Sequence, residues 1–338
     1  MREIKVGVVG VGIQGEQHVK AYKAHPLVEL KAIADINEKR LKEVSDKYGI
    51  EHKYTDYREM IEKEDLDLVS IVTPDFLHFE PVTFALNHGV NVIVEKPLAM
   101  NVEEAEKMVN LAKSKKLMLF VDFANRWNPP FAVAKEKVSS GELGKPLYAY
   151  FRLSDTKYVP FKMLSWAAKT SVVFFLMSHT ADLARWIFED EVEYVYAVAS
   201  RKYLKSRGVD TYDYVVAILE FRNGGRALLE SAWILPESLP SIVDFRAEIL
   251  CEEGSIFIDD LCQGIEVASK TYEYPRYAGG YVINEKYVGF TREAIHHAVD
   301  CLIEGKEPII TPEDALANTK ILCSIIESIK KKTKVQVK

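Results

Sequence analysis

A glutamate, a lysine and a proline follow an apolar run near the middle of the first half of the chain. Residues 90–94, VNVIV, have the composition of a buried strand. Pro97 cannot donate a hydrogen bond to a sheet ladder, so the strand is expected to stop at Glu95 and Lys96. Ligands of open α/β sheets bind at the carboxyl ends of the strands. The pattern predicts an acid and a base in a ligand-binding crevice, with a surface ion pair as the alternative.

Three glycines form the pattern G-x-G-x-x-G between a predicted strand and a predicted helix. Gly10 permits a tight turn, Gly12 lets the backbone approach a pyrophosphate, and Gly15 allows close helix–strand packing. The N-terminus of the helix would face the phosphates. The pattern predicts a dinucleotide site, and three structural glycines in an unliganded turn are the alternative. The intervening residues expected at this site are Val11, Ile13 and Gln14.

Asp35 ends the second predicted strand and could accept hydrogen bonds from the adenosine ribose hydroxyls. Its carboxylate would repel a 2′-phosphate, and Ile36 adds no positive charge. NAD is therefore predicted over NADP, although Arg40 is near enough in sequence to weaken this argument. Thr73, Pro74 and His78 follow another strand and are expected in the same crevice, where His78 could equally be structural.

Alternating strands and helices in the first 124 residues predict a parallel, doubly wound sheet with right-handed crossovers. The strands are expected at 4–9, 29–35, 67–73, 90–96 and 117–123, and the helices at 14–24, 37–49, within 74–89, and at 101–116. From residue 145 the pattern changes to antiparallel strands with glycine-containing turns at 223–225 and 252–254. Two helices are expected near 289–304 and 312–329.

The chain resembles the glucose–fructose oxidoreductase/inositol dehydrogenase/MocA (Gfo/Idh/MocA) family over essentially its full length. The motifs that carry the resemblance are GVVGVGIQGEQH with Asp35, VTPDFLH at 72–78, EKP at 95–97, NRWNPPF…SGELGKP at 125–146, a stretch around His179, and the ending at 289–321. The resemblance implies an α/β Rossmann dinucleotide-binding domain, residues 1–124, and an α+β domain, residues 125–338. The second domain would have an open, mostly antiparallel sheet with flanking helices.

The resemblance also implies a reaction, which is hydride transfer between NAD(P) and a secondary alcohol or ketone of a sugar, a polyol or a derivative. Lys96 would point between nicotinamide and substrate and polarise the reacting oxygen, and Glu95 would lie near the nicotinamide ribose or amide. Pro97 resembles a cis-proline of the family. Association into a homodimer or homotetramer through the C-terminal sheet is implied as well.

His179 is the second predicted catalytic residue, since a histidine can take or return a hydroxyl proton near neutral pH. Family dehydrogenases have an aspartate four residues earlier, where this chain has Phe175, and glycines where it has Thr170 and Ser171. Asp182 or Asp155 could replace that carboxylate. Otherwise His179 works alone, Lys96 is the main acid–base group, or activity is lost. A structural role for His179 is the alternative.

Further substrate-binding candidates are weaker, and each has an equally good packing role. Arg126 could hold a polar or anionic group, Trp166 and Trp233 could form apolar walls against a sugar ring, and residues 274–281 resemble a loop near an entrance. The complete set of predicted substrate-binding residues is Lys96, Arg126, Arg152, Asp155, Trp166, His179 and Asp182.

Composition limits the other function classes. The chain has 338 residues, a net charge of −6 and no basic block, so nucleic acid is not an expected partner. It shows no signal peptide and no apolar run near membrane-spanning length, so a cytoplasmic protein is expected. The four cysteines lack metal-type spacing, and no metal is expected. A non-catalytic dinucleotide sensor and an NAD-assisted glycoside hydrolase are the alternative functions.

Overall fold

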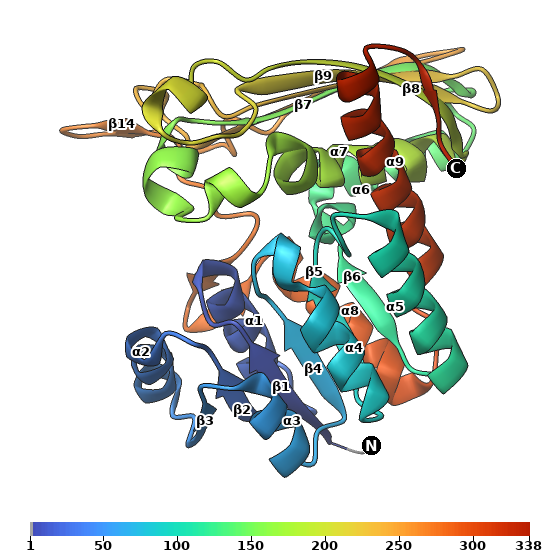
Figure 1. Ribbon diagram of the computed structural model, residues 1–338. Helices are drawn as coiled ribbons and strands as arrows, with labels where there is room; N and C mark the ends of the chain where they lie inside the picture. The colour runs from blue at the N-terminus through green and yellow to red at the C-terminus, as the bar shows by residue number, and fades with distance from the viewer. Residues whose placement is uncertain (1–2) are drawn as a thin grey trace. The chain divides into compact units, whose positions relative to one another are not determined.

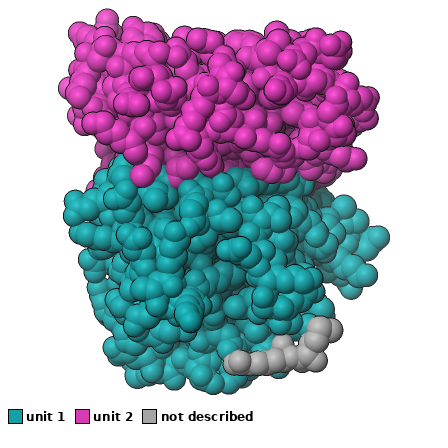
Figure 2. Space-filling model, turned by 90° about the vertical axis from the view of Figure 1, so that its right-hand side faces the viewer, with its two compact units in different colours: residues 1–127, 278–316 teal, residues 128–277, 317–338 magenta. Residues whose placement is uncertain are grey.

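The computed structural model describes residues 3–338, and the chain divides into two compact units (Figures 1 and 2). Unit 1 contains the chain up to Trp127 together with Ala278–Leu316, and unit 2 contains Asn128–Tyr277 and Ala317–Lys338. The sequence placed a single boundary after residue 124. The structure differs in that residues 278–316 pack with the N-terminal segment.

Unit 1 is built on a six-stranded sheet in the order β3-β2-β1-β4-β5-β6, with every neighbouring pair parallel. This is the strand order of a dinucleotide-binding fold, and it confirms the predicted doubly wound sheet. The strands are β1 (Ile4–Val9), β2 (Val28–Ala34), β3 (His52–Tyr54), β4 (Leu68–Ile71), β5 (Asn91–Glu95) and β6 (Leu119–Asp122). The helices are α1 (Ile13–Lys23), α2 (Glu38–Tyr48), α3 (Tyr57–Lys63), α4 (Phe79–Asn87), α5 (Val102–Lys115) and α8 (Phe290–Glu304).

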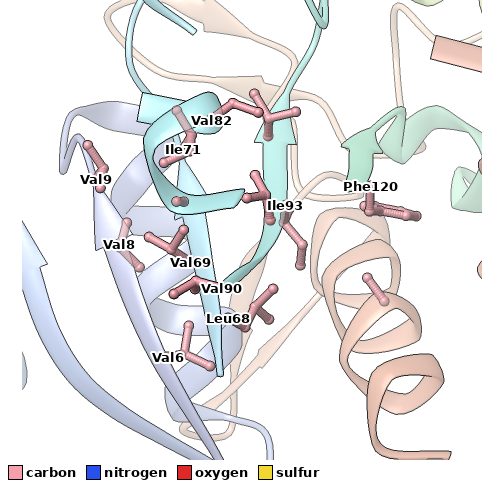
Figure 3. Close-up of a cluster of buried hydrophobic side chains, with 14 of the residues drawn as sticks. Val6, Val8, Val9, Leu68, Val69, Ile71, Val82, Val90, Ile93 and Phe120 are labelled. Carbon is pink, nitrogen blue, oxygen red and sulfur yellow. The ribbon is translucent and has the colours of Figure 1, made fainter. Parts of the chain in front are cut away.

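The core of unit 1 explains why its strands are nearly continuous apolar runs. Helices lie on both faces of a parallel sheet, so side chains on both faces are buried. Val6, Val8, Val69 and Ile93 are all fully buried within this core (Figure 3). Helix α8 contributes Ile295, Ala298 and Val299 to the same core and packs against α1. A segment late in the chain therefore completes the N-terminal fold.

Unit 2 is built on a seven-stranded sheet in the order β12-β11-β7-β10-β9-β8-β17. All neighbouring pairs are antiparallel except β7 and β10, so the prediction of a mostly antiparallel sheet is confirmed. The strands are β7 (Pro146–Asp155), β8 (Val192–Ser200), β9 (Tyr214–Phe221), β10 (Arg226–Ala232), β11 (Val243–Cys251), β12 (Ser255–Asp259) and β17 (Val335–Gln336). Two short hairpins, β13 (Val267–Ala268) with β14 (Tyr272–Glu273) and β15 (Tyr281–Ile283) with β16 (Lys286–Val288), complete the strands.

The two faces of the seven-stranded sheet differ in character. Burial alternates along the strands, and helices α6 (Pro129–Ser139) and α7 (Ser178–Phe188) lie on one side of the sheet (Figure 1). The opposite face, called the outer face below, carries the exposed apolar side chains Tyr148, Tyr196, Val198, Tyr214, Ile218, Leu250 and Phe257. Helix α9 spans Pro312–Lys331. Over residues 3–338, no helix combines the length and apolar character that crossing a membrane requires.

Candidate functional site

The glycine-rich turn between β1 and α1 gives each of its three glycines a different role. Gly10 has φ +86°, and a Cβ there would lie 2.6 Å from the carbonyl oxygen of Val72. A Cβ on Gly15 would lie 1.9 Å from the carbonyl oxygen of Gly10. A Cβ on Gly12 would meet no atom within 4 Å. Gly10 and Gly15 are therefore required by the fold itself, whereas the space beside Gly12 is open, as a site for close approach by a ligand requires.

The N-terminus of α1 has no side-chain cap, as is also true of α4 and α8 in unit 1. Helices α2, α3 and α5 begin with Asn37, Asp56 and Asn101, whose side chains accept hydrogen bonds from first-turn N–H groups. Helix α1 begins after Gly12 and has no such side-chain cap. Its first N–H groups and the positive end of the helix dipole suit an anion. The turn and the uncapped helix together fit the pyrophosphate of a dinucleotide.

Asp35 lies beside this turn. Its Oδ2 accepts a hydrogen bond of 2.8 Å from the Val11 N–H, and its Oδ1 accepts one of 2.8 Å from the Asn37 N–H. The backbone thus fixes the carboxylate next to the turn, where it can accept from ribose hydroxyls. Two apolar side chains near it, Ile13 and Ile36, are 63% and 90% exposed, and they offer apolar contact area to a bound base.

Arg40 is the cation whose position could weaken the preference for NAD. Its Nε donates a 2.8 Å hydrogen bond to the Val11 carbonyl, and its guanidinium pairs with Glu16 and Glu43. Burial alone would raise the pKa of Glu16, but hydrogen bonds from Lys47, Tyr48 and Arg40 lower it to about 2. Glu16 is therefore an anion at neutral pH. The charge of Arg40 is already balanced inside the protein, which favours NAD.

His78 is held by the backbone on both sides of its ring. Nδ1 lies 2.8 Å from the Pro97 carbonyl oxygen, and Nε2 lies 2.9 Å from the Thr73 carbonyl oxygen. The ring is buried. These contacts favour the structural role of His78, which links the segment after β4 to the segment after β5, over direct contact with a cofactor. Thr73 and Pro74 are half-buried at the carboxyl edge of the sheet.

The end of β5 has the predicted arrangement. The strand stops at Glu95, and the peptide bond between Lys96 and Pro97 is cis, as the resemblance implied. Glu95 Oε2 accepts from the Lys96 N–H at 3.2 Å, and Oε1 accepts from Gln14 Nε2 at 3.4 Å. Glu95 is buried and Lys96 is half-buried. Glu95 therefore connects the catalytic candidate Lys96 to the first turn of α1.

A buried cluster beneath this point was missed by sequence reasoning. His18 Nε2 lies 3.4 Å from Glu95 Oε1 and 3.6 Å from Asp122 Oδ2. One ring nitrogen of His18 and one carboxyl oxygen of each acid lie within 4.8 Å of one another. Burial and then the charge of Glu95 raise the pKa of Asp122 well above its ordinary value, while Lys96 acts in the opposite direction. The sequence offered one indication of this cluster: His18 follows Gly15 by about one turn on α1, close to the predicted dinucleotide site.

In unit 2, His179 is the second residue of α7 and is half-exposed. A π-helical turn, Val173–Met177, precedes it and contains Phe175. The Phe175 ring lies 6.0 Å from the Trp166 ring and 5.6 Å from the Trp233 ring, measured between centroids. An aromatic cluster therefore occupies the position where the resemblance implied a carboxylate.

Two aspartates were predicted to replace that carboxylate. Asp155, at the end of β7, is buried, and its Oδ2 accepts a 3.1 Å hydrogen bond from Trp233 Nε1. Trp233 is itself fully buried, so it belongs to the core instead of forming an exposed wall. Asp182 is buried on α7, three residues after His179. Asp155 thus supports the aromatic cluster, and a role for Asp182 beside His179 stays a prediction.

The two arginine candidates have structural partners. Arg126 is buried in unit 1, where its Nη1 lies 3.3 Å from the Ile309 carbonyl oxygen and 3.5 Å from Asp314 Oδ2. Arg152 lies on the outer face of the unit 2 sheet, 3.2 Å from Asp244 Oδ2. Helix α7 covers the other face, so the sheet separates Arg152 from His179. Its position does not favour the predicted substrate contact.

Comparison with known families matches most of the chain. Residues 4–123 match a GFO_IDH_MocA family described as "Oxidoreductase family, NAD-binding Rossmann fold". Residues 131–257 match the "GFO/IDH/MocA C-terminal domain". The first match lies in unit 1 and the second in unit 2, and both agree with the resemblance found in the sequence motifs.

Curated relatives and solved structures agree with the family matches. The chain is 28% identical over 318 residues to myo-inositol 2-dehydrogenase of Thermotoga maritima, covering 92% of each chain. It is 30% identical over 265 residues to levoglucosan dehydrogenase of Pseudarthrobacter phenanthrenivorans, covering 68% of each. A structure of levoglucosan dehydrogenase in complex with NADH superposes with a TM-score of 0.85 at 27% identity, covering 100% of both chains.

Proposed function

Because the chain belongs to the GFO/IDH/MocA family of NAD-binding oxidoreductases, we propose that it oxidises a secondary alcohol of a sugar or polyol, or reduces the corresponding ketone. The observation that carries this proposal is the position of Lys96. It follows β5 at the same carboxyl edge of one parallel sheet as the glycine-rich turn and Asp35. Because ligands of such sheets bind at this edge, a cation here supports the proposed contact with a substrate oxygen beside the dinucleotide.

The residues that would hold NAD are those of the turn, the first residues of α1, and Asp35. When bound, NAD supplies the hydride acceptor or donor. Lys96 binds the substrate oxygen, and its ammonium stabilises negative charge that develops there during hydride transfer. His179 takes the hydroxyl proton in oxidation and returns it in reduction. Neither role depends on a carboxylate at position 175.

The substrate class follows from the relatives, whose names give myo-inositol and levoglucosan as their substrates. We therefore propose a polyhydroxylated ring as the substrate of this chain. The outer face of unit 2 carries exposed aromatic and aliphatic side chains over several strands, which is typical of a surface that is covered in an assembly. We propose that a homodimer or homotetramer forms through this face. The cytoplasmic location stays a prediction.

Turnover of NAD with a panel of inositols, hexoses and anhydrosugars, followed by NADH absorbance, tests the proposal. Lys96→Ala and His179→Ala should each lower kcat by about 100- to 10,000-fold while NADH binding, measured by fluorescence, changes little. Lys107→Ala, which removes an exposed lysine paired with Glu103 on α5, is the matched control. Full turnover by Lys96→Ala would refute the proposed role. Release of an aglycone without net NADH formation would instead indicate a glycoside hydrolase.

The assembly is tested separately by light scattering after size-exclusion chromatography. Ile218→Glu places a charge on the outer face and should lower the molar mass toward that of one chain. Ile309→Glu changes a similarly exposed isoleucine in unit 1 and should leave the mass unchanged. A wild-type protein with the mass of one chain at micromolar concentration would refute the assembly.

A further inference from the structure

The cluster of His18, Glu95 and Asp122 has no direct part in the proposed reaction. Glu95 and Asp122 are register partners on the parallel strands β5 and β6, so the sheet holds their carboxyl groups side by side. His18 reaches them from α1. His18 is fully buried, and Glu95 and Asp122 are 7% and 3% exposed. Two carboxyl groups placed so close together out of water cannot both carry a full charge.

Hydrogen bonds on the other side of His18 favour one position for its ring proton. Burial raises the pKa of Tyr22, so the phenol keeps its proton and can donate it to Ser70 Oγ. The Ser70 hydroxyl can then donate to His18 Nδ1, 3.0 Å away. With Nδ1 accepting, the ring proton lies on Nε2, the nitrogen that faces the two carboxyl groups. His18 Nε2 is then the donor to Glu95 Oε1, 3.4 Å away, and it lies 3.6 Å from Asp122 Oδ2.

The two carboxyl groups differ in their other contacts. Glu95 also accepts from the Lys96 N–H and from Gln14, contacts that favour its anionic form. Asp122 Oδ1 is buried and has no hydrogen-bond partner among residues 3–338. The titratable groups that face Asp122 are Glu95 on β5, Lys96 after it, His18 and Tyr22 on α1, and Tyr287 on β16. Of these, Lys96 is the one that favours a charged Asp122, and burial with Glu95 outweighs it.

We propose that His18 and Asp122 are positioning residues: Asp122, as an uncharged acid, and His18, as an Nε2–H donor, hold the Glu95 carboxylate against the Lys96 backbone. Glu95 joins the start of α1, through Gln14, to the residue that meets the substrate. A charged Asp122 would repel Glu95 and compete for the His18 proton. This inference rests on the proposed role of Lys96 at the substrate oxygen.

The first test concerns the proton on Asp122 and needs no substrate. Because the folded state holds this proton more tightly than the unfolded state, stability contributed by Asp122 falls as pH rises from about 4 toward its raised pKa. The unfolding constant of wild type relative to Asp122→Asn should therefore rise up to tenfold per pH unit in that window. Asp46→Asn, which changes an exposed aspartate paired with Lys42, should show no such rise.

Infrared spectroscopy gives a second readout of the same proton. Wild type at neutral pH should show a carboxylic-acid C=O band that Asp122→Asn lacks. If Asp122→Asn does not fold, alkaline titration of wild type should remove the band. Absence of the band at neutral pH, or a flat ratio of unfolding constants, would overturn the proposal. Stoichiometric zinc in the purified protein would also overturn it, because these three residues could then be metal ligands.

The second test concerns positioning and compares two changes at one residue. His18→Leu removes the donor, and His18→Gln keeps an amide N–H within reach of Glu95. We expect kcat to fall about 10- to 100-fold in His18→Leu, with little change in KM, and to recover by at least threefold in His18→Gln. Equal losses in both variants would overturn the positioning role. If no polyol or sugar supports NAD turnover, the proposed function is wrong, whereas the infrared and unfolding tests of the Asp122 proton can still be interpreted.

Discussion

Replacing Gly12 or Gly15 with alanine should have opposite consequences, although both changes add one methyl group to the same turn. At Gly12 the methyl group would enter open space, and the backbone has φ −65°, which alanine adopts readily. At Gly15 the methyl carbon would lie 1.9 Å from the Gly10 carbonyl oxygen. Contacts below 3.0 Å essentially never occur for a Cβ, so at least about 1 Å of movement is required. The atom in the way belongs to the backbone and cannot rotate aside.

The expected magnitudes follow from these distances. Overpacking a rigid region costs about 1–3 kcal/mol, and the Gly15 contact belongs at the upper end of this range or above it. Gly12→Ala should change the free energy of unfolding by less than about 1 kcal/mol, and it can stabilise because alanine restricts the unfolded chain. Its methyl group would instead obstruct the pyrophosphate. A clash of about 1–3 kcal/mol weakens binding about 5- to 150-fold.

Urea unfolding and NADH titration measured on both variants separate these effects. Gly12→Ala should unfold like wild type and bind NADH at least fivefold more weakly. Gly15→Ala should unfold at clearly lower urea concentration whether or not NADH is present. If Gly12→Ala binds NADH as tightly as wild type, the pyrophosphate does not approach the turn at this residue, and the assignment of the site is wrong.

Three further outcomes are expected. Asp35→Ser should lower the ratio of kcat/KM with NAD to kcat/KM with NADP at least tenfold, because the carboxylate held by the Val11 N–H no longer repels a 2′-phosphate. An unchanged ratio would contradict the role of Asp35 in cofactor preference. Glu16 has a lowered pKa, so the stability it contributes is present above about pH 4.5 and is lost as pH falls through about 2. The free energy of unfolding of Glu16→Gln, measured in urea, should therefore depend less on pH in that window than that of wild type. An equal pH dependence would show that the hydrogen bonds from Lys47, Tyr48 and Arg40 do not stabilise the Glu16 anion. Phe175→Asp should lower the free energy of unfolding by about 2–3 kcal/mol because contacts with Trp166 and Trp233 are lost, and Phe175→Leu should lower it by about half as much. Thermal denaturation measures both changes. An unchanged stability of Phe175→Asp would show that these aromatic contacts do not stabilise the fold.

The sequence was sufficient to predict the parallel sheet and the edge at which Lys96 and Asp35 lie. Strand ends are marked locally, by a proline, a glycine or an acidic residue after an apolar run, and parallel strands bring those ends to one edge. The spacing of the glycines predicted open space at Gly12 and close packing at Gly15, and the distances from a Cβ placed at each residue agree with both.

Other features depend on contacts that local patterns do not contain. Asp122 is far from His18 in sequence, and they meet only because β6 is the register partner of β5 while α1 crosses the same region. A helix was predicted near residues 289–304, but the sequence did not show that it would pack in unit 1. Arg40 could be read as a free cation until its contacts with Glu16 and Glu43 were known.

The discontinuous composition of unit 1 limits how this protein can be divided. The chain passes between the units three times, after residues 127, 277 and 316. A fragment ending at Trp127 would lack Ile295, Ala298 and Val299, and the apolar surface that they cover would meet water. Transplanting the nucleotide-binding half into another enzyme would therefore require the 278–316 segment as a companion piece, supplied in the same chain or as a second polypeptide.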